Sequence, residues 1–169
     1  ISQEILNQAL LAASNAPCHK HTHPWKFYIL GKATRTKLIP TISRLAAIKS
    51  AKQNSQNLEA DCSRAINKIT QPPLLIAVTS KKTEDDSFRE KEDYAATVCA
   101  LHNLVLSLWE NGVGSQWSTG SITRDEETYD ILSIDSKTEE IIGFVKAGYP
   151  EKTREVRKKP VVDIVNYLD

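Results

Sequence analysis

Residues 89–111 carry the longest helical pattern in the chain. Apolar side chains recur there every third or fourth position and form one wide face, made by Tyr94, Ala95, Val98, Leu101, Leu104, Val105, Leu108 and Trp109 and widened by Ala96, Cys99, Ala100 and Leu106. A helix with so wide an apolar face is expected at the centre of a fold. Its apolar part is short for a membrane span and contains His102 and Asn103, so we predict a buried helix that Gly112 ends.

Short apolar segments on either side of this helix predict a sheet. We expect strands at residues 25–30, 74–79, 115–119 and 141–147. Further helices are expected at residues 2–15, 34–50, 124–132 and 161–168, and another one ends at residue 70. Pro40 is expected to kink or restart the helix at 34–50. Helices and strands are mixed without strict alternation, which indicates a single α+β domain over residues 1–169 with one sheet covered by helices.

The charge balance excludes some partners. The chain has 22 basic and 21 acidic residues and a net charge of +1, so no strong field attracts nucleic acid or an acidic membrane surface. Its three cysteines match no disulfide or zinc spacing, and residues 1–15 show no signal-peptide pattern. We therefore expect a cytoplasmic protein. The chain lacks methionine and starts at Ile1, so we expect the native N-terminus to precede it.

The densest polar cluster lies in residues 18–24, where His19, His21 and His23 alternate with other polar residues. Three histidines facing one way could bind zinc, although Lys20 adds positive charge among them. A solvated loop is a second interpretation. A third is a site for a phosphate or a flavin, because histidine and lysine donors suit anions and carbonyl oxygens.

Two glycines after the long helix do not form a nucleotide-binding turn. Gly112 and Gly114 begin a dinucleotide fingerprint, but Trp117 occupies the third glycine position, and here the helix precedes the strand. Ser118 and Thr119, followed by Gly120, could instead present hydroxyl and N–H groups to a planar ligand, or form a simple turn.

No catalytic side chain stands out. The chain has no nucleophile elbow or Ser-His-Asp order. His102 could be a base, but on an apolar helix we expect a hydrogen-bonded core histidine, and Cys99 is expected to behave as a small hydrophobe. Glu92 and Asp93, near the start of the long helix, are expected to complement its dipole.

Four segments together resemble the nitroreductase family, specifically its compact bacterial members. Residues 12–27 contain AASNAP and PWKF, and residues 73–78 read PLLIAV. Residues 94–117 run from YAA to GVGSQW, and residues 141–150 read IIGFVKAGYP. The family's N-terminal Arg-Arg-Ser-x-Arg signature is absent, and His23 replaces its usual Gln, which is expected to alter affinity or acceptor choice.

The resemblance implies an α+β homodimer with a central, mostly antiparallel sheet flanked by helices and FMN at the subunit interface. It implies an oxidoreductase that transfers hydride or electrons from NAD(P)H to a nitroaromatic, quinone or similar flat acceptor, without a catalytic side chain or a metal. Two alternatives stay open: a non-catalytic flavin-binding sensor or carrier of the same fold, and a metal-dependent hydrolase that uses the three histidines.

The resemblance also implies residue roles. Asn15 and His19 would reach FMN in the partner subunit, while Trp117, Ser118 and Thr119 would meet the flavin of their own subunit. Arg157 or Lys159 would hold the FMN phosphate. Nicotinamide nucleotide binding is implied for Ser107, Leu108, Trp109, Glu110, Asn111 and Gly112.

Overall fold

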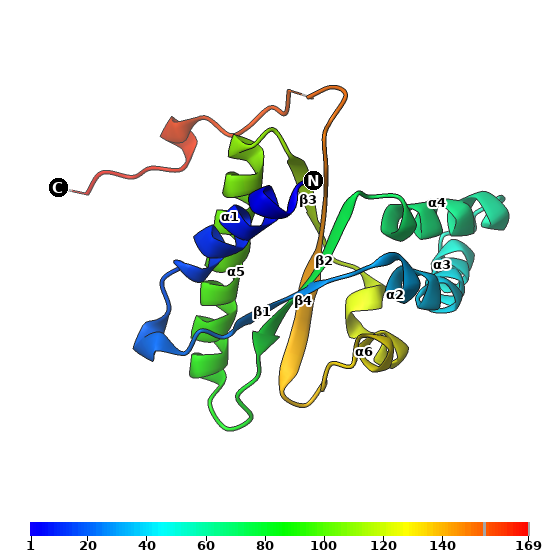
Figure 1. Cartoon of the computed structure of the whole chain (residues 1–169), viewed down its shortest axis with the longest axis horizontal. Helices are drawn as coiled ribbons and strands as arrows, with labels where there is room; N and C mark the ends of the chain where they lie inside the picture. Colours follow the sequence, from blue (N-terminus) through cyan, green and yellow to red (C-terminus); the bar gives the residue numbers. More distant parts are fainter. Residues whose placement is uncertain (154, 169) are drawn as a thin grey trace.

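A computed structural model describes residues 1–153 and 155–168 and shows one four-stranded sheet (Figure 1). The strands are β1 (Trp25–Ile29), β2 (Leu74–Lys81), β3 (Gly114–Ser118) and β4 (Glu139–Gly148), in the order β1-β2-β4-β3. Every neighbouring pair is antiparallel. This arrangement confirms the predicted α+β fold with its antiparallel sheet.

Helices cover both faces of the sheet. One face carries α1 (Gln3–Ser14) and α5 (Ser87–Glu110), which pack against each other. The other face carries four helices, all shorter than α5: α2 (Lys32–Lys37), α3 (Ile39–Lys52), α4 (Leu58–Thr70) and α6 (Glu126–Leu132). None of the helices in the described ranges is long and apolar enough to cross a membrane.

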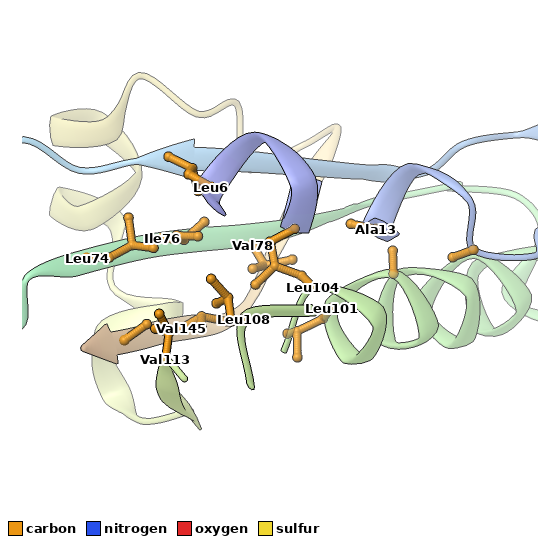
Figure 2. Close-up of a cluster of buried hydrophobic side chains, with 14 of the residues drawn as sticks. Leu6, Ala13, Leu74, Ile76, Val78, Leu101, Leu104, Leu108, Val113 and Val145 are labelled. Atoms are coloured by element: carbon orange, nitrogen blue, oxygen red, sulfur yellow. The ribbon is translucent and has the colours of Figure 1, made fainter. Parts of the chain in front are cut away.

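Strand β2 forms the centre of both apolar cores. Its side chains alternate between the faces: Ile76 and Val78 join the core under α1 and α5, which Figure 2 shows, while Leu75 and Ala77 join the core under the shorter helices. All four are fully buried. The continuous apolar run therefore forms a strand buried on both sides, as the sequence predicts.

Helix α5 is only half covered, which corrects the expectation of a helix surrounded by core. Ala100, Leu104 and Leu108 are fully buried against α1 and the sheet. On the opposite side Trp109 is 55% exposed and Leu106 52% exposed. Tyr94, Ala95, Cys99 and His102 are exposed as well, so the expectation of a core histidine at 102 is wrong. Periodicity shows that this face is apolar but not whether the same chain covers it.

One helix prediction is confirmed and another needs correction. The segment expected over residues 34–50 forms two helices, because Pro40 lies in the first turn of α3 and restarts the helix there, as predicted. The helix predicted over residues 161–168 is a single 3-10 turn, Val161–Asp163. Residues 155–168 are exposed, so they lack the tertiary packing that usually stabilises a short helix.

Candidate functional site

A cleft of about 460 Å³ lies on the sheet face covered by the shorter helices. Its walls are α3 and α4 on one side and, on the other, the end of β3 with the 3-10 turn η2 (Ser121–Arg124). Figure 1 shows α3 and α4 extending beyond the sheet at this side. A volume in this range suits a small organic ligand.

Strands β3 and β4 form the floor of the cleft. Gln116 is paired with Lys146, and Ser118 with Phe144, so these four side chains point to the same face. The Ser118 hydroxyl donates to the carbonyl oxygen of Phe144 at 3.4 Å. The polar floor residues are thus held in place by the register of two strands far apart in sequence.

The walls of the cleft are largely apolar. Aliphatic and aromatic side chains from three helical segments and β4 line it: Ile42, Leu45, Ala46, Ala65, Ile69, Ile122 and Phe144. Such a lining favours a ligand with a flat, apolar body.

The turn after β3 offers backbone donors to the cleft. Within residues 1–153 and 155–168, the N–H groups of Thr119, Gly120 and Ser121 donate to no protein acceptor. The carbonyl oxygen of Gly120 accepts from both the N–H (3.1 Å) and the hydroxyl (2.9 Å) of Thr123, which fixes the turn. Three fixed, unused N–H groups beside an apolar wall suit the carbonyl and nitrogen acceptors of a heterocycle.

Positive charge dominates the cleft. Four basic side chains line it, Lys49, Arg64, Lys68 and Lys146, and Asp61 is the only carboxylate among its described lining residues. Asp61 is already engaged: hydrogen bonds with Ser55 and Ser50, together with Arg64, lower its pKa to about 2. The surplus of positive charge favours a ligand that carries negative charge.

Trp117 supports the floor from the opposite side. Because it lies between Gln116 and Ser118 in the strand, its side chain points away from the cleft, and its indole N–H donates to the carbonyl oxygen of Ile142 at 3.2 Å. A Cβ at Gly143 would lie 2.1 Å from Nε1 of Trp117, so only glycine leaves room for this ring. The tryptophan predicted to meet the flavin therefore positions the strand instead of lining the cleft.

The histidine loop lies on the other face of the molecule, beside α5. Thr22 donates to the buried carboxylate of Asp93 at 2.6 Å, and Arg89 donates to the carbonyl oxygen of His19 at 3.4 Å. Asp93, predicted only to complement the helix dipole, thus anchors this loop. Lys20, His21 and His23 have positive φ angles, a strained backbone often found at functional sites.

The remaining predicted residues lie outside the cleft of their own chain. Asn15 ends α1 and is exposed, as is His19. The segment predicted for the nicotinamide ends α5: Leu108 is in the core, Asn111 donates to the carbonyl oxygen of Ser107 at 2.9 Å, and Gly112 has a φ of +72°. Arg157 and Lys159 are exposed in the C-terminal segment.

The sequence analysis predicts none of the four basic residues of the cleft, Lys49, Arg64, Lys68 and Lys146. For Lys146 one signal exists, because it is the lone cation of the apolar strand IIGFVKA. The metal-site alternative receives no support, since the described residues contain no group of three or more His, Cys, Asp or Glu side chains that could hold a metal ion.

Comparison with known proteins gives the family. Residues 1–149 match the model of the nitroreductase family. The chain is 28% identical over 165 residues to the Bacillus subtilis (strain 168) protein named "Putative NAD(P)H nitroreductase YfhC", covering 96% of this chain and 82% of that relative.

Solved structures share the fold. A nitroreductase-like family protein from Bacillus cereus superposes with a TM-score of 0.77 at 23% identity, over 99% of this chain and 86% of that one. A nitroreductase with bound FMN from Bacteroides fragilis superposes with a TM-score of 0.72 at 20% identity, over 100% of this chain and 89% of that one. These structures show the shared fold, and the family-model match over residues 1–149 shows that the chain belongs to the nitroreductase family.

Proposed function

We propose that this protein is an FMN-dependent oxidoreductase that passes hydride or electrons from NAD(P)H to a nitroaromatic, quinone or similar flat acceptor. The observation that carries the proposal is the cleft beside Ser118, Thr119 and Gly120, which combines an apolar wall, free N–H donors and surplus positive charge. Membership of the family, the name of the Bacillus subtilis relative and the FMN in the Bacteroides fragilis structure support it.

The donor set of the cleft fits FMN. The apolar side chains Ile42, Ile69 and Phe144 would contact the ring, and the N–H groups of Thr119 and Gly120 would hold its polar edge. Bound FMN supplies the electron-carrying chemistry, and the protein binds, orients and tunes it. The one carboxylate among the described residues of the cleft, Asp61, is engaged by Ser50 and Arg64. We therefore propose that no carboxylate of the cleft acts as an acid or base.

A second copy of the chain would complete the site. Exposed apolar side chains gather on α1 and α5, including Leu11 (64% exposed) and Trp109 (55% exposed). The C-terminal segment adds Val162, Tyr167 and Leu168, also exposed. Apolar surface on adjoining helices is typical of a symmetric interface between identical subunits. In such a homodimer the loop with Asn15 and His19 belongs to the interface, and we propose that it reaches the flavin of the partner.

The remaining roles are proposals on the same basis. The end of α5, residues 107–112, would contact the nicotinamide nucleotide, and Arg157 or Lys159 would hold the FMN phosphate. Of these residues only Leu108 is buried. The others are exposed or half-buried, at the end of α5 or in the C-terminal segment.

Two measurements on the purified protein test the proposal. The first is FMN titration by quenching of flavin fluorescence, for which we expect saturation at one FMN per chain. The second is NAD(P)H oxidation with nitroaromatic and quinone acceptors, for which we expect turnover that requires FMN. Binding without turnover with any acceptor would instead favour the sensor or carrier alternative. Absence of FMN binding would contradict both.

A further inference from the structure

Lys146 is the one described lysine of the cleft that is half-buried rather than exposed. It projects from the floor, next to Phe144 and opposite Gln116. No carboxylate of the described residues pairs with it. Burial of a cation without a counter-charge is costly, so such a group calls for a partner that the protein chain does not supply.

The surroundings of Lys146 increase this need. Lys68 on α4 faces the same part of the cleft, and burial, together with the charge of Lys68, lowers the pKa of Lys146. The other charged groups of the cleft are Lys49 on α3 and the Asp61–Arg64 pair on α4. Asp61 is already paired with Arg64, so it is not a free counter-charge for the lysines.

We propose that Lys146, supported by Lys68, is the cation that stabilises the negative charge of the reduced flavin ring. The inference rests on the proposed function. Hydride transfer from a nicotinamide adds two electrons and one proton to the neutral oxidised ring and leaves the nicotinamide oxidised. The ring thereby gains one negative charge. Lys146 lies on the floor of the cleft, two residues along β4 from Phe144, the pairing partner of Ser118, and would be close to this charge.

The position of Lys146 indicates that its partner is the flavin ring of FMN and not the FMN phosphate. Phosphate is a strongly hydrated group with close to two negative charges, which suits exposed cations such as Arg157 and Lys159, to which we assign it. The ring is flat and largely apolar and fits the buried floor beside Phe144. Because oxidised flavin carries no charge on its ring, Lys146 would favour the reduced state selectively and raise the reduction potential of the bound flavin.

The test uses the FMN-loaded full chain and three variants. Lys146→Met removes the charge and keeps an unbranched side chain, while Lys146→Arg keeps the charge. Lys49→Met removes an exposed charge from the same cleft and is the matched control. For each variant we would measure the two-electron midpoint potential by spectroscopic titration against a reference dye, and the dissociation constants of oxidised FMN and riboflavin. Circular dichroism would check that each variant is folded.

We expect Lys146→Met to weaken binding of reduced relative to oxidised FMN by about tenfold, which lowers the two-electron midpoint potential by about 30 mV. Lys146→Arg should keep most of the wild-type midpoint potential. Lys49→Met should lower the potential by less than a third of the shift measured for Lys146→Met. An unchanged potential in folded Lys146→Met would overturn the inference. A loss of affinity for FMN but not riboflavin, at unchanged potential, would assign the lysine to the phosphate and also overturn it. Failure of the wild-type chain to bind FMN would instead refute the proposed function.

Discussion

Gly143→Ala should disturb the floor of the cleft through Trp117. The added Cβ would lie 2.1 Å from Nε1 and 2.6 Å from Cδ1 of Trp117, and 3.0 Å from the backbone oxygen of Ser118. The first two distances are far inside van der Waals contact, so the ring or strand β4 must move. Overpacking of this kind costs about 1–3 kcal/mol. The hydrogen bond from Trp117 to Ile142 would be strained or lost as well, which adds about 1 kcal/mol.

Urea unfolding followed by circular dichroism measures this cost. We expect Gly143→Ala to lower the free energy of unfolding by about 2–4 kcal/mol. FMN affinity should fall too, because the shift reaches Ser118 at the edge of the cleft. Gly31→Ala is the control: a Cβ there meets no atom within 4 Å, so its effect should stay within about 0.5 kcal/mol. A Gly143→Ala protein as stable as the control, with wild-type FMN affinity, would refute the proposed support of the floor.

Three further changes test other parts of the account. Hydrogen bonds from Lys26, Thr79 and Tyr28 outweigh burial and hold the pKa of Glu139 below its usual 4.5, so Glu139→Gln should cost about 1–3 kcal/mol at pH 7. Because the folded-state pKa is the lower one, the difference in unfolding free energy from wild type should shrink as the pH falls below 4.5. Trp109→Glu places a charge on the uncovered face of α5 and should convert the proposed dimer to monomer in sedimentation equilibrium; a wild-type monomer, or a dimer unchanged by the substitution, would contradict the proposed interface. His19→Ala should weaken FMN binding roughly three- to tenfold without loss of helix signal, as expected for one hydrogen bond; equal affinity would remove this residue from the site.

The sequence predicts the secondary structure where the signal is local. The apolar run at residues 74–79 and the stop at Gly112 after α5 depend on neighbouring residues, and both elements form as expected. The turn at Ser118 and Thr119 also lines a cleft, as its small hydroxyl residues suggest.

Other features depend on tertiary contacts that periodicity does not encode. The apolar pattern of α5 does not reveal that α1 and the sheet cover only one side, and His102 was misplaced for this reason. Residues 161–168 have helical spacing but nothing in the described chain to pack against. Lys146 meets Lys68 only because β4 pairs with β3 beside α4, a register that brings together residues almost eighty positions apart.

Amide hydrogen exchange with and without FMN tests the central claim, that the cleft after β3 is the flavin site. The N–H groups of Thr119, Gly120 and Ser121 donate to no acceptor in the described chain, so they should exchange rapidly in the free protein. The account predicts that saturating FMN slows exchange in residues 119–121 at least tenfold and leaves α6, on the same layer but outside the cleft lining, unchanged. Saturation with FMN and no protection in residues 119–121 would contradict it.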